Sequence, residues 1–128
     1  MYELLIYTAI LSEDEDNIST SEEQRLLPAV ELVRAGYGEK LTNKQLADAA
    51  GISEMHLLRL FKTVFRRTPK EYVTEYRMEQ AKRKLLRHPN RSVRQIAKEV
   101  GYTDMTAFNT SFKSYSGFAP NDYRNINL

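Results

Sequence analysis

The sequence contains an internal repeat, and no other feature constrains the fold as strongly. Gln45-Leu46-Ala47, with Gly51 shortly after, recurs at an offset of 50 residues as Gln95-Ile96-Ala97, with Gly101 shortly after. At an offset of 51, Leu57, Phe61-Lys62, Pro69 and Tyr72 then match Phe108, Phe112-Lys113, Pro120 and Tyr123. Because the offset changes, we expect one inserted residue in the turn after Gly101. The chain is expected to build the same small unit twice.

Each unit is predicted to consist of a short helix, a turn and a longer helix. No segment alternates apolar and polar residues for long enough to predict a strand, so the expected fold class is all-α. Capping boxes of the form S/T-x-x-E/Q predict helix starts at Thr42, Thr68 and Ser92. Pro69 suits the first position of a helix, where its missing N–H is not needed. Helix ends are predicted at glycines, namely Gly36, Gly51, Gly101 and Gly117.

The second helix of each unit has an apolar face that is expected to pack inward. The residues of this face are Leu57, Phe61 and Val64 in the first unit, and Phe108, Phe112 and Tyr115 in the second. Two helices joined by a short turn containing glycine are typical of the helix-turn-helix, whose second helix enters the major groove of DNA. A single helical pair also occurs in proteins that never touch DNA, but two in tandem favour DNA binding.

The net charge of +2 conceals a strong asymmetry along the chain. Residues 1–36 hold two basic and eight acidic side chains, which gives −6, whereas residues 37–128 give +8. The basic part predicts a polyanionic partner, and charge alone leaves nucleic acid and a membrane surface open. A short apolar helix is expected at Tyr2–Leu11 and an acidic solvated linker at Ser12–Glu23. The apolar segment is too short to span a bilayer and lacks the basic flank of a signal peptide.

The composition argues against an enzyme. The chain has no cysteine and only two histidines, His56 and His88. Disulfides, thiol catalysis and cysteine-ligated zinc are therefore excluded, and little material remains for a histidine-based metal site. The sequence has no glycine-rich phosphate loop and no carboxylate pair at a convincing spacing. We expect no catalysis, no metal and no cofactor, and a cysteine-free chain fits a reducing cytoplasm.

Pro69–Arg87 lies between the two units and is predicted to be one helix of 19 residues. At 1.5 Å per residue, such a helix is roughly 28 Å long. Successive major grooves on one face of DNA are about 34 Å apart. A rigid spacer of this order suits two recognition helices that bind one duplex.

The repeat and the residues around it resemble the C-terminal DNA-binding domain of the AraC/XylS family of bacterial transcription regulators. The resemblance covers about residues 27–124. It is carried by Leu41-Thr42, Leu46-Ala47, Ser53, Leu57, Arg59-Leu60-Phe61-Lys62, Thr68-Pro69, Tyr72, Arg77, Ala81, Leu85-Leu86, Ile96-Ala97, Val100-Gly101-Tyr102, Phe108, Phe112-Lys113, Gly117, Pro120 and Tyr123-Arg124. It implies about seven helices in two helix-turn-helix subdomains joined by a long linker helix, with promoter binding by both recognition helices.

The resemblance also implies a domain organisation and a set of partners. A DNA-binding domain is expected at 24–128, with helix-turn-helix motifs at about 42–65 and 92–116 and the linker helix at 69–87. Residues 1–23 resemble the remnant of an upstream regulatory domain, through which a longer regulator would dimerise, and this chain is expected to be monomeric. The implied partners are double-stranded promoter DNA and RNA polymerase, and no membrane. The implied role is usually activation, in the bacterial cytoplasm and nucleoid.

On the first recognition helix, the resemblance places the base-facing positions at Met55, Leu58 and Arg59. The Arg59 guanidinium can grip guanine O6 and N7 with two hydrogen bonds. Its alternative is a solvated arginine beside Glu54 or Glu79. Met55 and Leu58 can pack on thymine methyl groups, and their alternative is the core of the subdomain.

The second recognition helix has a different chemistry. Its outward positions include Thr106, Ala107, Asn109 and Thr110 as candidates for base contact. Asn109 can read adenine, and Thr106 and Ala107 can contact thymine methyls. Thr110 stands at the position of Arg59, where many members of the family carry arginine. Because no basic side chain of this helix reaches the bases, we expect the first unit to carry most of the sequence discrimination.

Contacts to the DNA backbone are expected near the ends of the helices. The predicted residues are Thr42, Ser53, His56, Lys62, Arg66, Arg67, Ser92 and Lys113. For His56, a surface histidine without DNA contact is an equal alternative. Arg66 stands where the second repeat has Gly117, so either the loop differs or Arg66 accepts a positive φ with mild strain. Asp104 would repel phosphate unless it caps the second recognition helix.

The basic run Lys82-Arg83-Lys84, with Arg87 and Arg91, is expected to be a solvated face that complements the dipole of the linker helix. Tyr72, Tyr76, Ala81 and Leu85 are expected in the core. An alternative function is a helical protein-interaction adaptor or anti-activator whose basic surface binds an acidic partner. The tandem repeat argues against this alternative.

Overall fold

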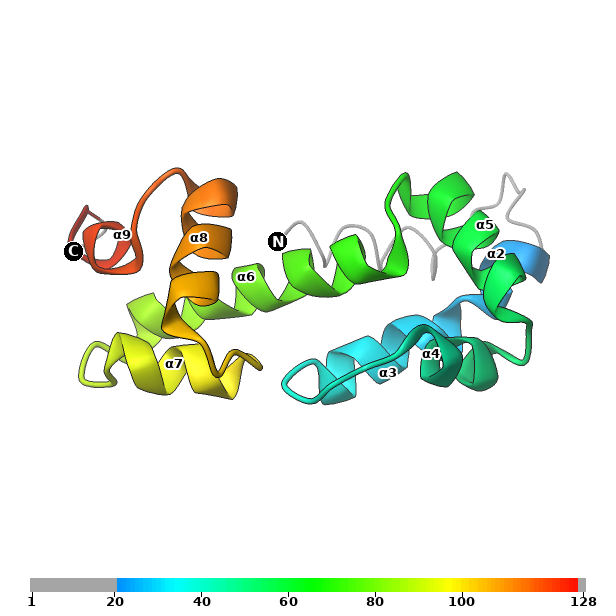
Figure 1. The fold of residues 1–128 in the computed structure, drawn as a ribbon, viewed down its shortest axis with the longest axis horizontal. Helices are drawn as coiled ribbons and strands as arrows, with labels where there is room; N and C mark the ends of the chain where they lie inside the picture. The colour runs from blue at the N-terminus through cyan, green and yellow to red at the C-terminus, as the bar shows by residue number, and fades with distance from the viewer. Residues whose placement is uncertain (1–20, 127–128) are drawn as a thin grey trace. The chain divides into compact units, whose positions relative to one another are not determined.

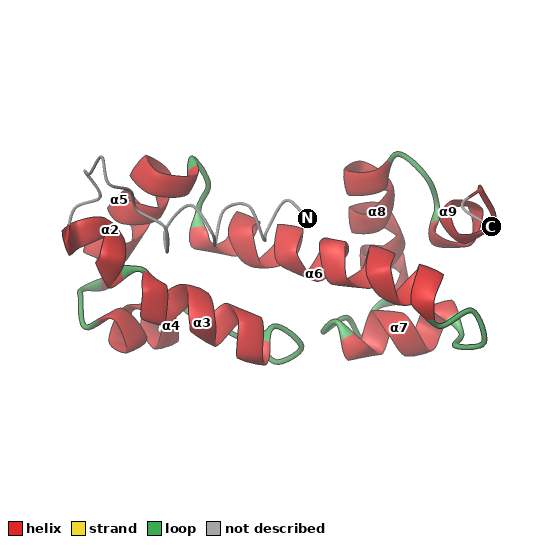
Figure 2. Cartoon of the chain, turned by 180° about the vertical axis from the view of Figure 1, so that it is seen from behind, coloured by secondary structure: helices red, strands yellow, loops and turns green. Residues whose placement is uncertain are grey.

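The computed structural model describes residues 21–126, which are all-helical and contain no strand (Figures 1 and 2). The helices of this range are α2 (Ser21–Arg25), α3 (Leu27–Gly36), α4 (Asn43–Ala50), α5 (Glu54–Phe65), α6 (Pro69–Arg87), α7 (Val93–Glu99), α8 (Met105–Ser116) and α9 (Pro120–Ile126). The all-α prediction is confirmed, and the seven helices α3–α9 are those that the resemblance implied. The apolar helix predicted at Tyr2–Leu11 lies outside the described residues.

Helix α2 was not predicted, because the sequence places Ser21–Glu23 in the acidic linker. A helix of five residues has too few internal hydrogen bonds to form alone. Helix α2 instead packs against α3 and α5, and Leu26, which follows it, is fully buried. Tertiary contacts therefore extend the folded part further into the acidic segment than local composition suggests.

The chain divides within α6 into two compact units, the first ending at Tyr76 and the second beginning at Arg77. The first unit buries side chains of α3, α4, α5 and the first half of α6. Its core includes Val30, Val33, Leu46, Leu57, Phe61, Phe65 and Tyr72. The Phe61 ring meets the Tyr72 ring edge-on at 5.5 Å, and Tyr37 meets Tyr76 in the same way at 5.3 Å.

The second unit has its own core, formed by the second half of α6 with α7, α8 and α9. Its fully buried side chains are Met78, Ala81, Leu85, Ile96, Ala97, Val100, Phe108 and Phe112. The prediction that Tyr115 faces inward is wrong, because its side chain is 38% exposed. Tyr123 of α9 packs edge-on against Phe112 at 5.4 Å, so α9 contributes to this core.

The helix starts agree with the predicted capping boxes. The Gln45 amide donates to Thr42 Oγ1 at 3.1 Å, and the Thr42 amide donates to Gln45 Oε1 at 2.8 Å. The same reciprocal pair joins Thr68 to Glu71 and Ser92 to Gln95. In the Thr68 box the hydrogen bond from the Thr68 backbone N–H lowers the pKa of the Glu71 carboxyl below its ordinary value.

The helix ends agree with the four glycine predictions, although only three of these glycines are left-handed. Gly51, Gly101 and Gly117 have positive φ angles, whereas Gly36 does not. Gly36 is the last residue of α3, as predicted, but Tyr37 caps that helix in the right-handed region, so α3 ends without a left-handed glycine. Arg66 has φ 61° and is the non-glycine residue with positive φ in the described part of the chain. Of the two alternatives predicted for this loop, the correct one is therefore that Arg66 accepts a positive φ with mild strain.

Candidate nucleic-acid interface

Helices α4 and α5 form the helix-turn-helix of the first unit. Gly51 takes a left-handed conformation with φ 70°, and the next amide, of Ile52, donates to the Ala47 carbonyl at 3.0 Å. Ser53 then caps α5, because its Oγ accepts the His56 amide at 3.1 Å. Leu57 of α5 is fully buried. The turn and the buried residue fix which face of α5 points outward.

The outward face of α5 carries large apolar side chains together with positive charge. Met55 is 77% exposed and Leu58 is 41% exposed, so the alternative that places them in the core is wrong. Arg59 and Lys62 are exposed on the same helix. The spacing 55, 58, 59, 62 places these four side chains on one face. Arg59 makes no ion pair with any residue in the range 21–126.

Helices α7 and α8 form the second helix-turn-helix. Gly101 has φ 100°, and the next amide, of Tyr102, donates to the Ala97 carbonyl at 2.8 Å. Asp104 caps α8, and its carboxylate accepts the amides of Thr106 at 2.9 Å and Ala107 at 3.4 Å. The cap therefore lies one residue further from the glycine than Ser53 lies from Gly51. The predicted insertion in this turn is confirmed, and the Asp104 carboxylate is used by the helix itself.

The outward face of α8 lies at the same place in its motif as the outward face of α5, but it carries different side chains. Thr106, Ala107, Asn109 and Thr110 are all exposed, as is Lys113. At the repeat offset of 51, Thr106, Asn109, Thr110 and Lys113 correspond to Met55, Leu58, Arg59 and Lys62. The two recognition helices thus present matching faces, one apolar and basic and the other small and mostly neutral.

Several predicted backbone-contact residues also have roles within the protein. Thr42, Ser53 and Ser92 each accept a backbone amide as a helix cap. The Arg67 guanidinium pairs with Glu75, with 2.6 Å between Nε and Oε1, and donates to the Phe65 carbonyl at 2.9 Å. Arg67 therefore holds the turn between α5 and α6. Lys62, Arg66 and Lys113 are exposed, and His56 is half-buried.

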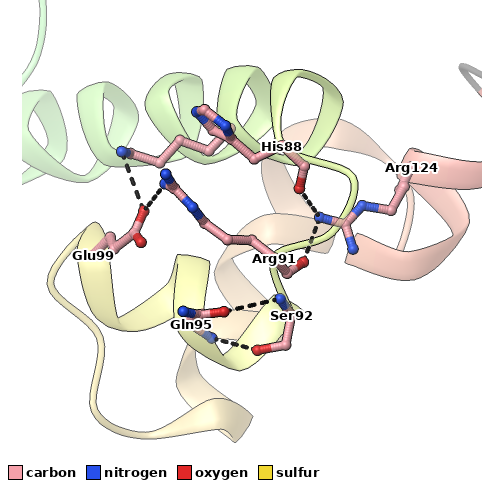
Figure 3. A network of polar contacts seen from close by, with 7 residues as sticks. His88, Arg91, Ser92, Gln95, Glu99 and Arg124 are labelled. Carbon is pink, nitrogen blue, oxygen red and sulfur yellow. Dashed lines mark hydrogen bonds and ion pairs between the residues drawn. The ribbon is translucent and has the colours of Figure 1, made fainter.

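The basic residues at the end of α6 are less solvated than expected. Lys82 pairs with Glu79 at 3.1 Å. Lys84 and Arg91 both reach the Glu99 carboxylate, at 3.2 Å and 2.9 Å (Figure 3). The two pairs with Glu99 join the end of α6 and the connection after it to α7, so part of the basic run stabilises the second unit.

Arg124 has a structural role that the sequence analysis did not identify. Its guanidinium donates to the carbonyl of Leu85 at 3.1 Å. It also donates to the carbonyls of His88 at 3.2 Å and Arg91 at 2.8 Å (Figure 3). It therefore satisfies carbonyls at the C-terminal end of α6 and in the connection that leads to the Ser92 cap of α7. These partners lie 33 to 39 residues away in the sequence, so no local pattern indicates them.

Arg77 supports the turn of the second helix-turn-helix. Its guanidinium carbon lies 5.8 Å from the centre of the Tyr102 ring. A Cβ placed on Gly101 would lie 2.8 Å from the same carbon. A larger residue at this position would therefore displace the Arg77 guanidinium in addition to adopting an unfavourable φ angle. Gly51, the matching residue of the first unit, has nothing within 4 Å of such a Cβ.

The described part of the chain has no group of three acidic or histidine side chains that could hold a metal ion. None of its helices is both long and apolar enough to cross a membrane. What the two units share is a pair of packed helices that presents the exposed face of the second helix to solvent.

Comparisons with known proteins agree with this arrangement. A family model described as "Helix-turn-helix domain" matches residues 46–126. The raffinose operon transcriptional regulatory protein RafR of Pediococcus pentosaceus is 35% identical over 111 residues, which cover 87% of this chain and 40% of that protein. The lactose operon transcription activator of Staphylococcus xylosus is 32% identical over 96 residues, which cover 75% of this chain and 34% of that protein.

A solved structure has the same fold. The crystal structure of a transcriptional regulator from Chromobacterium violaceum, described as an AraC-type DNA-binding domain-containing protein, superposes with a TM-score of 0.76 at 27% identity. The match covers 82% of this chain and 93% of that one. The fold and the two exposed helices define a tandem helix-turn-helix domain of the DNA-binding class. The chain belongs to the AraC/XylS family of transcription regulators, which confirms the resemblance found in the sequence.

Proposed function

We propose that this chain is the domain of a transcription regulator that binds double-stranded DNA in a sequence-specific way. The regulator is proposed to be an activator. In this proposal α5 and α8 enter successive major grooves of promoter DNA. The observation that carries the proposal is the pair of matching exposed faces on the second helices of the two motifs. In this proposal the chain works as a DNA-binding protein and not as an enzyme, and it needs no metal or cofactor.

The first unit is proposed to read bases through Met55, Leu58 and Arg59. Arg59 has no competing ion pair in the described range, so its guanidinium is available to bind guanine with two hydrogen bonds. Exposure of 77% for Met55 and 41% for Leu58 places apolar surface beside it, which suits thymine methyl groups. The second unit is proposed to contact bases through Thr106, Ala107, Asn109 and Thr110, with less discrimination.

The DNA backbone is proposed to meet basic and hydroxyl groups on both units. Lys62, Arg66 and Lys113 supply exposed positive charge. Ser53 and Ser92 accept an amide through Oγ, which leaves the hydroxyl proton free to be donated to phosphate. Thr42 and His56 are also proposed to contact the DNA backbone. The Glu75 and Phe65 contacts of Arg67 favour a structural role for that residue over phosphate binding.

The wider context is also a proposal, because the chain spans 40% or less of the length of the relatives described above. We propose that the 128-residue chain binds DNA as a monomer. Dimerisation and signal recognition, where they occur, would reside in other parts of a longer regulator. An activator of this kind would contact RNA polymerase at the bacterial nucleoid in the cytoplasm.

The proposal is tested by selecting duplex DNA from a random library with the purified chain and measuring affinity by fluorescence anisotropy. Arg59→Ala should relax the preference at one base pair by about 1–3 kcal/mol. Thr110→Ala, at the matching position of the second unit, should have a smaller effect. Scrambling the first half-site should cost more affinity than scrambling the second. Absence of binding to any duplex at low salt would instead favour the protein-interaction adaptor.

A further inference from the structure

A hollow of about 160 Å³ lies beside the start of the second recognition helix. It is lined by Arg94 and Lys98 of α7, by Tyr102 and Thr103 of the turn, and by Met105 at the first position of α8. Arg94 and Lys98 are exposed and have no ion-pair partner in the described range. Two uncompensated positive charges therefore line this hollow.

The first unit has a different charge at the matching positions. At the repeat offset of 50, Arg94 corresponds to Lys44 and Lys98 corresponds to Asp48. Lys44 and Asp48 form an ion pair at 3.1 Å, so this face of α4 is neutral. Like charges four residues apart destabilise a helix. The Arg94–Lys98 pair therefore destabilises α7, whereas α4 has no such like-charge pair at the matching positions.

The inserted residue of the second turn contributes to the same hollow. The turn from Gly101 to the Asp104 cap contains Tyr102 and Thr103, where the first unit has only Ile52 between Gly51 and the Ser53 cap. Thr103 is exposed, and its hydroxyl can donate to an anion. Tyr102 is held by the Phe108 ring at 5.5 Å and by a hydrogen bond to Ser111 Oγ at 3.4 Å. The lengthened turn and the two cations therefore line the same hollow, and the packing of Tyr102 holds the turn in place.

We propose that Arg94, Lys98 and Thr103 form a binding site for a phosphate of the DNA backbone, which anchors the second unit. This inference rests on the proposed function. In a helix-turn-helix the first helix crosses the backbone while the N-terminal residues of the second contact bases, and the hollow lies between these two elements. The base-facing side chains of α8 are neutral, so the charge that holds this unit on DNA comes from Lys113 at the end of α8 and from Arg94 and Lys98 of α7. The second unit thus contributes position more than sequence discrimination.

The test measures the affinity of the full chain for a fluorescein-labelled duplex selected from the random library, as a function of salt. Removing one phosphate contact should reduce the slope of log K against log[salt] by about 0.9. The Arg94→Gln/Lys98→Gln double variant, which leaves the phosphate without a cation, should do so and should weaken binding roughly eightfold at about 0.1 M salt, with the difference fading toward 1 M. Each single variant should show part of both effects. Thermal melting should show no loss of stability, because each variant removes a like-charge pair.

Matched variants of the first unit provide the control. Lys44→Gln, which removes an ammonium already paired with Asp48, should change the slope much less. A neutral methylphosphonate at one position of the second half-site should weaken the wild type and leave the Arg94→Gln/Lys98→Gln double variant unaffected. An unchanged slope in both single variants, with normal binding by the wild type, overturns the phosphate site and leaves the proposed function standing. Failure of the wild type to bind duplex DNA at all would overturn both.

Discussion

Gly51 and Gly101 occupy matching positions in the two turns, and alanine substitutions at them should have different costs. Gly51 has φ 70° and open space where a Cβ would lie, whereas Gly101 has φ 100° and the Arg77 guanidinium carbon 2.8 Å from that point. Both substitutions impose a left-handed conformation on alanine, which costs roughly 1–2 kcal/mol near the ideal left-handed region. Reduced freedom of the unfolded chain offsets about 0.4–1 kcal/mol of this strain. Gly51→Ala should therefore destabilise its unit by only about 0.5–1 kcal/mol.

Gly101→Ala carries two further costs. Its φ of 100° lies further from the left-handed minimum, where non-glycine residues cost on the order of 1–3 kcal/mol. The Cβ would also displace the Arg77 guanidinium from the Tyr102 ring, a cation–π contact worth roughly 0.5–1 kcal/mol at an exposed site. Since the end of an arginine side chain can move, we add no larger steric penalty. Gly101→Ala should therefore destabilise the second unit by about 1.5–3 kcal/mol.

The assay is urea unfolding of the full chain followed by circular dichroism, with hydrogen exchange to assign each transition to a unit. In an Arg77→Ala background, the difference between the two glycine variants should shrink by roughly 0.5–1 kcal/mol, because the displaced contact is already absent. Equal destabilisation by Gly51→Ala and Gly101→Ala would refute this reasoning. So would a difference that Arg77→Ala leaves unchanged.

Three other substitutions test separate features. Arg66→Gly should stabilise the first unit by about 0.5–1 kcal/mol in thermal melting, because it removes a strained left-handed conformation, and should reduce the salt slope of DNA binding by about 0.9; lower stability would contradict this. Arg124→Gln should destabilise the second unit by about 2–4 kcal/mol, because three carbonyls lose a charged donor, whereas the exposed Arg87→Gln should cost no more than about 0.5 kcal/mol; similar losses would refute the role of Arg124. Because the pKa of Glu71 is lowered in the folded state, its stabilisation is complete above the ordinary value of 4.5 and is lost as pH falls through the lower folded value. Glu71→Gln should therefore flatten the acid side of the melting-temperature profile, and an unchanged profile would exclude this contribution.

Some features of the site could be predicted and others could not, and the distance between the partners explains the difference. The Thr42, Thr68 and Ser92 caps were predictable because each joins residues three positions apart. For Met55 and Leu58, sequence left exposure and burial both open, because an apolar side chain suits either. The roles of Arg77 and Arg124 were not predictable from local patterns. Arg77 lies over the ring of Tyr102, on a later element of the chain. Arg124 donates hydrogen bonds to carbonyls more than thirty residues away.

The sequence by itself determined that this chain is a repeated helical pair. Helix caps, the left-handed glycines and the apolar period act over a few residues, and the repeat showed that the same local rules operate twice. Only the tertiary structure decided which cations remain available for DNA. Lys84 and Arg91 both pair with Glu99 of α7, which folding brings close to them, whereas Arg94 and Lys98 have no ion-pair partner in the described residues. The charge of a side chain is fixed by its identity, but its partner on another helix is fixed by how the two helices pack.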